Sequence, residues 1–236
     1  RGPMNEVFRL GVFSRGTTLW DGLDFALGDA AAWFVAGPPS SGKSLLLSIL
    51  RGERKPDAGD VLVSGESLYR GNAAVARAWR AYCVHVPEQT IFDARLTVGD
   101  LFRRSALAGG GVRESERKDR TDRLLGMVGL PGALGWRAAE LSISERVRAR
   151  LAAELLRGPK VLFCDGVVAG AGNTCREMLW GLFRALAREG NTVVLAERTI
   201  PERWALAAGD AETVGPFQVY RLPAPGGGAS TKGEPG

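Results

Sequence analysis

The order of apolar and polar positions predicts alternating strands and helices along most of the chain. Segments that alternate, or that carry β-branched and aromatic residues between turns, suit strands at Val7–Phe13, Leu23–Leu27 and Val61–Val63. Short apolar runs that suit buried strands follow at Ala32–Ala36, Tyr82–Val86, Val161–Cys164 and Thr192–Leu195. Helical periodicity separates the later runs, and a first helix is expected at Lys43–Arg51. We therefore predict an α/β fold with a mainly parallel core sheet, crossover helices and an N-terminal antiparallel β part.

One stretch of this pattern departs from strand and helix alternation. From Leu96 to Ala139 the periodicity is helical and the sequence more charged, which indicates an inserted α-helical lobe over about residues 92–140. We expect a single domain over residues 4–222. Residues 1–3 precede Met4 and resemble a tag remnant, and residues 223–236 are so rich in Pro, Gly and Ser that we expect a disordered tail.

Composition narrows the class of protein. The chain has 236 residues, 45% of them hydrophobic, which is enough for a sizeable core. No apolar run approaches the ~18 residues of a membrane-spanning helix, so we expect a soluble, cytoplasmic protein. The net charge of +5 is modest and the arginines are not gathered into one stripe, so no nucleic-acid partner is expected. Three cysteines without metal-ligand spacing fit a reducing compartment.

A phosphate-binding motif lies directly after one predicted strand and directly before a predicted helix. It matches the pattern G-x-x-x-x-G-K-[ST] and consists of Gly37, Pro38, Pro39, Ser40, Ser41, Gly42, Lys43 and Ser44. In such a loop the backbone N–H groups and the helix N-terminus face phosphate oxygens, the lysine neutralises the β and γ charges, and the serine ligates Mg²⁺. The motif predicts a P-loop NTPase that binds ATP with Mg²⁺.

The motifs together resemble the nucleotide-binding domain of ATP-binding cassette (ABC) transporters, especially the short stand-alone ATPases of the cell-division and lipoprotein-releasing kind. The resemblance covers roughly residues 5–222 and includes the stretch KPDAGDVLVSGESLY. It implies that Asp165 organises the magnesium ion and that an aromatic near Phe13 stacks on adenine, although Ser14 matches that position by count. It also implies that two such domains face each other head to tail, with Ser142 of the signature segment contacting the opposite nucleotide.

Several positions depart from the pattern that this resemblance implies. Gly166 stands where the family has the catalytic glutamate, and Glu197 stands where it has a histidine that faces the γ-phosphate. Glu88, a further candidate magnesium ligand, occupies the place of the glutamine that links the lobe to the core, and Gly172 replaces an aspartate. A positioned general base contributes typically ~10²–10⁴ in rate, so these changes together predict a loss of hydrolysis with the phosphate loop kept.

The signature segment itself reads Leu141-Ser-Ile-Ser-Glu145 in place of the family's LSGGQ. Two interpretations stay open. Ser142 and Glu145 have the spacing of a capping box that starts a helix and contacts no phosphate. Alternatively the segment still approaches a partner's γ-phosphate, against the bulk of Ile143 and the charge of Glu145.

The sequence leaves three possible functions open. The first is a degenerate ABC-type subunit that binds Mg-ATP, hydrolyses it poorly or not at all, and acts as a structural or regulatory part of a membrane transporter-like complex. The second is an active transporter ATPase in which Glu88 or Glu197 activates water, and the third is a P-loop kinase or DNA-associated ATPase. The resemblance implies two partners on the inner face of the membrane: an integral membrane protein in a groove along Glu88–Phe102, and a second ABC ATPase in a heterodimer or homodimer.

Overall fold

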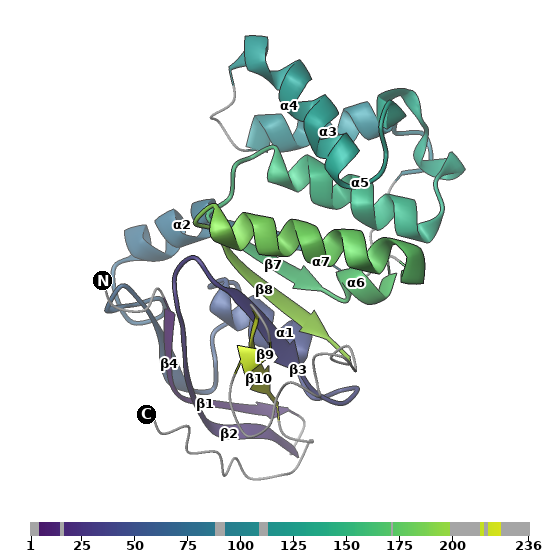
Figure 1. The fold of residues 1–236 in the computed structure, drawn as a ribbon. Helices are drawn as coiled ribbons and strands as arrows, with labels where there is room; N and C mark the ends of the chain where they lie inside the picture. The colour runs from purple at the N-terminus through teal and green to yellow at the C-terminus, as the bar shows by residue number, and fades with distance from the viewer. Residues whose placement is uncertain are drawn as a thin grey trace. The chain divides into compact units, whose positions relative to one another are not determined.

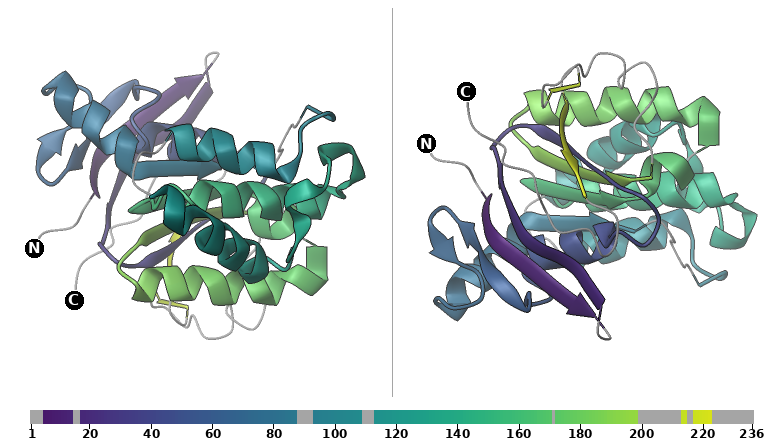
Figure 2. Two further views of the ribbon diagram at one scale, coloured as in Figure 1. Left: turned by 90° about the horizontal axis from the view of Figure 1, so that it is seen from above. Right: turned by 90° about the horizontal axis from the view of Figure 1, so that it is seen from below.

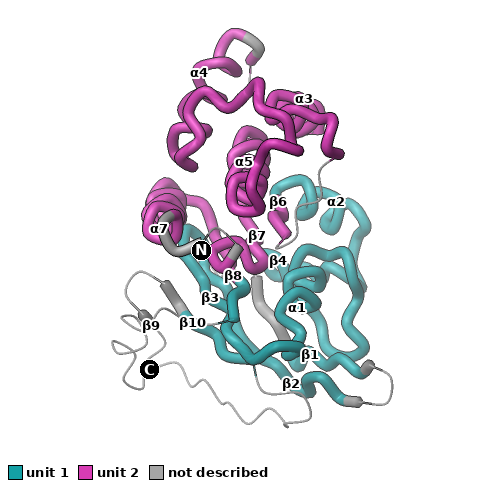
Figure 3. The backbone as a smooth tube through the Cα atoms, turned by 90° about the vertical axis from the view of Figure 1, so that its right-hand side faces the viewer, with its two compact units in different colours: residues 1–82, 196–236 teal, residues 83–195 magenta. Residues whose placement is uncertain are grey.

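In the computed structural model of the chain, the described residues are 5–14, 17–87, 93–108, 113–170, 172–198, 213–214 and 217–222. The chain separates into two compact units, one of residues 1–82 and 196–236 and the other of residues 83–195 (Figure 3). The expected tag remnant, Glu88 and the expected tail at 223–236 lie outside the described residues. The single domain over residues 4–222 stays a prediction.

The N-terminal part of the first unit forms an antiparallel sheet (Figure 1). Its described strands are β1 (Asn5–Ser14), β2 (Thr17–Leu27), β4 (Ala58–Val63) and β5 (Glu66–Ser67), in the order β2-β1-β4-β5. The register between β1 and β2 shifts at three places, which bends the pair. Side chains from both strands are at most 1% exposed, namely Leu10, Val12, Trp20, Leu23 and Leu27. The predicted N-terminal antiparallel part is confirmed.

The rest of the first unit supports the phosphate loop. The strand before the loop is β3 (Ala32–Ala36), which pairs in parallel with β10 (Phe217–Arg221), and β10 pairs antiparallel with β9 (Thr213–Val214). Two helices follow in sequence, α1 (Lys43–Leu50) and α2 (Ala73–Tyr82). The range predicted for β3 is confirmed, and α1 ends one residue earlier than predicted. Tyr82, predicted as the start of a strand, is instead the last residue of α2.

Three side chains satisfy the carbonyl groups at the C-terminal end of α1. The Tyr69 hydroxyl lies within hydrogen-bonding distance of the carbonyl oxygens of Ile49 and Arg54, the second at 2.7 Å, and its single proton is shared between them. Trp79 Nε1 donates to Leu50 O at 2.8 Å, and Arg80 Nη1 donates to Gly52 O at 2.9 Å. The last carbonyls of a helix have no partner within the helix, so these bonds fix where α1 ends. Burial is also the main reason that the pKa of Tyr69 is raised.

The second unit combines buried parallel strands with helices. The strands β6 (Cys83–Val86), β7 (Val161–Asp165) and β8 (Thr192–Glu197) lie in that order, and β6 pairs in parallel with β7. The second unit ends at Leu195, so the last two residues of β8 count with the first unit. The helices are α3 (Val98–Ala108), α4 (Glu114–Met127), α5 (Ile143–Leu155), α6 (Val167–Gly170) and α7 (Gly172–Arg188). Two short 3₁₀ turns, η1 (Ala133–Gly135) and η2 (Ala138–Glu140), precede α5.

The predicted helical lobe packs around α5. Helices α3 and α4 both contact α5, and they form the teal group in the two views of Figure 2. Arg148 on α5 is only 8% exposed, and its Nη1 donates to Val128 O at 2.8 Å and to Gly129 O at 3.1 Å. These bonds satisfy carbonyls at the end of α4 and join it to α5. The α/β class with an inserted helical part is confirmed.

Candidate nucleotide-binding site

The phosphate loop is held in shape by its own lysine. Lys43, the first residue of α1, donates from Nζ to Gly37 O at 2.7 Å and to Pro38 O at 2.8 Å. A longer contact of 3.5 Å joins Nζ to Ser41 Oγ. The ammonium group therefore lies across the loop and ties its beginning to its end. A lysine in this position brings its positive charge to the same place as the inward-facing backbone of the loop.

Two glycines of the loop are required by sterics. A Cβ atom at Gly37 would lie 2.6 Å from Ser41 Oγ and 3.1 Å from Leu222 Cβ. At Gly42, where φ is +86°, a Cβ atom would lie 2.3 Å from Trp20 Cζ2 and 2.5 Å from Leu19 Cδ2. Residues with a side chain also avoid a φ near +86°, whereas glycine adopts it readily. At Gly42 the Trp20 ring leaves no space for a side chain, and at Gly37 a side chain would have to displace the Ser41 hydroxyl.

Ser40 and Ser41 differ in their environments. Ser40 is exposed and has a φ of +62°, which a non-glycine residue adopts only under strain. Ser41 is completely buried, and its carbonyl accepts a hydrogen bond of 2.6 Å from Trp20 Nε1. Because Trp20 lies in β2, the antiparallel sheet braces the loop directly. Trp20 itself is 0% exposed, and its bond to the loop was not predicted.

We expect Trp20→Phe to lower the free energy of unfolding by about 1–3 kcal/mol, because the buried carbonyl of Ser41 loses its donor. The variant should also bind nucleotide more weakly, since the loop is less firmly held. Urea denaturation followed by calorimetric titration with ATP measures both effects. Trp33→Phe is the matched control, because Trp33 Nε1 makes only a 3.4 Å contact with Gly28 O outside the loop. Equal effects of the two substitutions would contradict this role for Trp20.

Phe13 lies at the exposed end of β1. Its side chain is 48% exposed, and its backbone N–H donates to Asp57 Oδ2 at 2.8 Å. This bond fixes the backbone of the residue and leaves the ring accessible. An exposed aromatic ring can stack on a flat apolar ligand such as a base. The predicted contact with adenine stays a prediction.

In the second unit, Asp165 and Gly166 mark the end of β7. Asp165 is the last residue of the strand and is half-buried. Gly166 follows it, is buried, and has a φ of +62°. A non-glycine residue pays a strain of about 1–3 kcal/mol in this region. The local backbone therefore suits glycine and disfavours the glutamate that the family resemblance places here.

The signature segment forms a complete capping box at the start of α5. The backbone N–H of Ser142 donates to Glu145 Oε2 at 2.8 Å, and the Ser142 hydroxyl donates to the same oxygen at 2.7 Å. In return, the Glu145 N–H donates to Ser142 Oγ at 3.3 Å. The side-chain bond and then the backbone bond from Ser142 lower the pKa of Glu145. Ile143, the first residue of α5, is 73% exposed.

The remaining predicted residues are less informative. Glu197 ends β8 and is 4% exposed. Glu88 lies outside the described residues, as stated above. Ser44 is exposed in α1 and belongs to the first unit, whereas Asp165 and Ser142 belong to the second. The structure brings the eight loop residues together, and it brings Ser142 and Glu145 together.

A profile of the ABC transporter family matches residues 20–169. The chain belongs to the ABC transporter family. It is 29% identical over 199 residues to the arabinose import ATP-binding protein AraG 1 of Burkholderia cenocepacia, which covers 84% of this chain and 39% of the relative. It is 31% identical over 218 residues to the Fe(3+) ions import ATP-binding protein FbpC of Streptomyces avermitilis, and this match covers 89% of this chain and 61% of the relative. The chain thus spans 39% and 61% of the length of these two relatives.

Solved ABC structures have the same fold. A dimeric ATP-binding cassette, MJ0796, bound to ADP and Pi in a post-hydrolysis state, superposes with a TM-score of 0.77 at 19% identity, covering 97% of both chains. The ATP-binding subunit of an ABC transporter superposes with a TM-score of 0.74 at 20% identity, covering 94% of this chain and 89% of that one. The predicted P-loop NTPase fold and the predicted ABC family are therefore confirmed. Among the described residues, no helix has the length and apolar character needed to cross a membrane.

Proposed function

We propose that this ABC-type chain binds Mg-ATP, hydrolyses it poorly or not at all, and serves as a structural or regulatory subunit of a membrane transporter-like complex. The observation that carries the proposal is Gly166, a buried glycine with positive φ directly after Asp165. No carboxylate follows the proposed magnesium-organising acid at this position, and the backbone disfavours one. The phosphate loop, in contrast, keeps its lysine, its serine and both sterically required glycines.

The residues of the phosphate loop, with Asp165, fit the phosphate groups and the Mg²⁺ ion that they would hold. The two glycines let the loop backbone pack directly against Trp20, Leu19 and Leu222, and the Lys43 ammonium group lies on the loop carbonyls, where its positive charge suits a phosphate. Mg²⁺ usually binds through few protein oxygens together with substrate phosphates and waters. Ser44 and Asp165 match that donor set, and the described residues contain no cluster of three or more His, Cys, Asp or Glu side chains for a self-contained metal site. When bound, the metal neutralises phosphate charge.

Two features of the signature segment are also expected to slow hydrolysis. The two donors that Ser142 would offer to a phosphate are already bonded to Glu145. Ile143 places an exposed branched side chain where a bare backbone is needed for close approach. The buried Glu197 supports the alternative of an active ATPase with a displaced base, because a carboxylate at a strand end is the kind of group that activates water.

The proposed partners follow from the family and from the names of the relatives, two of which are import ATP-binding proteins. We propose that an integral membrane protein contacts the surface of the helical lobe that includes residues 93–102, and that the chain works at the inner face of the membrane. We further propose that a second ABC ATPase completes the assembly. The solved dimeric cassette supports a dimer of this kind.

Calorimetry and a turnover assay on one purified sample test the proposed function. We expect Mg-ATP binding to the wild type, no binding to Lys43→Ala, and a turnover far below the ordinary enzyme range of roughly 1–10³ s⁻¹. Gly166→Glu alone should recover little activity, because the new residue is strained and the signature segment is still altered. Turnover near 1 s⁻¹ that disappears in Glu197→Gln would support the active alternative. Absence of binding at millimolar ATP would contradict the whole proposal.

A further inference from the structure

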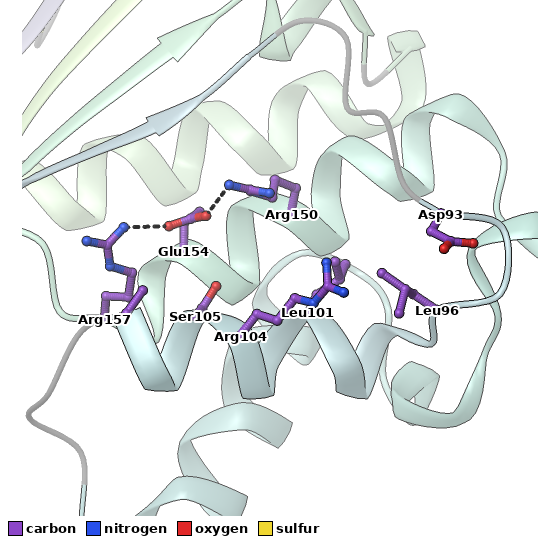
Figure 4. A pocket seen from close by; sticks show the side chains of 9 residues that line it. Asp93, Leu96, Leu101, Arg104, Ser105, Arg150, Glu154 and Arg157 are labelled. Atoms are coloured by element: carbon purple, nitrogen blue, oxygen red, sulfur yellow. Dashed lines mark hydrogen bonds and ion pairs between the residues drawn. The ribbon is translucent and has the colours of Figure 1, made fainter. Parts of the chain in front are cut away.

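A cavity of about 260 Å³ lies between α3 and α5, within the second unit (Figure 4). Its walls come from the segment before α3, from α3, from α5 and from Arg157, two residues beyond the end of α5. The lining residues that carry charge or a polar group are Asp93, Arg104, Ser105, Arg150, Glu154 and Arg157. Leu96 and Leu101 supply apolar surface. None of these residues belongs to the phosphate loop or to the signature segment.

The cavity carries an excess of positive charge. Glu154 is 5% exposed and pairs with Arg150 Nη2 at 2.5 Å and with Arg157 Nη1 at 3.1 Å, so one carboxylate is shared by two guanidinium groups. Figure 4 shows the two arginines on either side of Glu154. Arg104 adds a third guanidinium from α3. The lining thus holds three arginines against Glu154 and Asp93.

Asp93 does not reduce this excess, because it is neutralised from outside the cavity. Arg95 pairs with Asp93 at 2.9 Å and does not line the cavity. The side-chain hydrogen bond from Arg95 is the main reason that the pKa of Asp93 is lowered to about 2. The charges of Asp93 and Arg95 cancel each other. The remaining charged groups of the lining, three arginines and Glu154, then leave a net charge of two positive units.

Two donors in the same cluster lack partners. Within the described part of the chain, Arg150 Nε and Arg157 Nε are buried and make no hydrogen bond. Buried donors are nearly always bonded in folded proteins, so each such group calls for an explanation. Ser105, 7% exposed, adds a hydroxyl to the lining. Both Nε atoms are covered by protein, so an oxyanion in the cavity would be held by the accessible parts of the guanidinium groups and would balance their charge.

We propose that this cavity binds an oxyanion group, a carboxylate or a phosphate, through Arg104, Arg150 and Arg157. Ligand pockets for drug-sized molecules measure about 300–1,000 Å³, so a cavity of about 260 Å³ suits one small anion or a single inserted acidic side chain. A planar guanidinium is the donor best matched to carboxylate and phosphate oxygens. The group comes either from a free anion or from an acidic side chain of a segment that covers the lobe. Binding here is independent of the proposed binding of ATP.

Calorimetric titration at constant ionic strength, with citrate and with inorganic phosphate as probes, tests the free-anion source. We expect a dissociation constant of about 1 mM or tighter for wild type. Arg104→Gln should weaken binding at least about tenfold, the size expected when a charge-assisted hydrogen bond is lost. Arg103→Gln is the matched control, since Arg103 neighbours Arg104 on α3 but pairs with Asp100 outside the cavity. It should leave the affinity unchanged.

A second variant gives an effect of opposite sign. Glu154→Gln removes the internal carboxylate from Arg150 and Arg157, so it should tighten anion binding at least about tenfold. An alanine-rich helical peptide with one central glutamate, and its glutamine counterpart, test the second source in the same assay. Binding of the glutamate peptide alone assigns the cavity to an acidic side chain, and binding of citrate or phosphate alone assigns it to a free anion. The proposal is overturned if no probe binds, or if Arg103→Gln weakens binding as much as Arg104→Gln. ATP titrated into the same samples keeps this outcome separate from that of the proposed function.

Discussion

Gly42→Ala is expected to abolish Mg-ATP binding by this protein. The added Cβ atom would lie 2.3 Å from the Trp20 ring and 2.5 Å from Leu19 Cδ2, distances at which the loop or β2 must move. Movement of the loop pulls Ser41 away from Trp20 Nε1 and Lys43 away from the carbonyls it bridges. The backbone N–H groups then no longer converge on one point, which is what phosphate binding requires. Calorimetric titration with Mg-ATP measures the loss.

The control separates crowding from backbone strain. Gly65 has a φ of +83°, nearly the same as that of Gly42, but a Cβ atom there would meet nothing within 4 Å. Gly65→Ala therefore carries only the left-handed strain of roughly 1–2 kcal/mol and should bind ATP like the wild type. Circular dichroism shows whether each variant is folded. If folded Gly42→Ala bound ATP within a few fold of the wild type, the packing of Trp20 against the loop would have no functional role.

The sequence predicts those features that depend on neighbouring residues. The loop motif and the strand before it are local patterns, and the range expected for β3 agrees with the structure. The start of β2 at Thr17 was not predicted, because only its second half carries a clear strand pattern. The strand β10 was also not predicted. Its five residues stand far from β3 in the chain, and only their parallel pairing makes them part of a sheet.

The candidate site was predicted in its residues but not in its contacts. The hydrogen bond from Trp20 to Ser41 joins residues 21 positions apart, and no local pattern carries it. The positive φ of Gly166 is likewise a property of the folded backbone, which explains physically why a glycine suits the place after Asp165. For Ser142 and Glu145 the sequence left two interpretations open. The capping box is present, and whether the segment also meets a partner's phosphate stays a prediction.

The wild-type protein is expected to stay largely monomeric even in saturating Mg-ATP. In the proposed head-to-tail dimer, each nucleotide is gripped by one phosphate loop and by the signature segment of the other chain. A homodimer would present two signature segments in which Ser142 is bonded to Glu145, a carboxylate that also repels phosphate. Light scattering with and without Mg-ATP measures the mass. A tight ATP-dependent homodimer of the wild type would contradict both this expectation and the heteromeric arrangement.

Changing the signature segment should strengthen its contact with the nucleotide of the opposite chain and so strengthen ATP-dependent dimerisation. Glu145→Gln removes the negative charge, and Ile143→Gly removes the exposed branched side chain, so the double variant should dimerise with Mg-ATP at least about tenfold more tightly than wild type, or ~1.4 kcal/mol. Glu140→Gln is the matched control, because Glu140 makes a similar capping bond of 2.8 Å to the Arg137 N–H in η2 without belonging to the segment. With an intact cassette ATPase as partner, the wild-type loop can meet an unaltered signature segment, and ATP held there would stabilise the heterodimer by mass action. If the double variant and Glu140→Gln behaved alike, the capping carboxylate would not be what keeps the isolated chain monomeric.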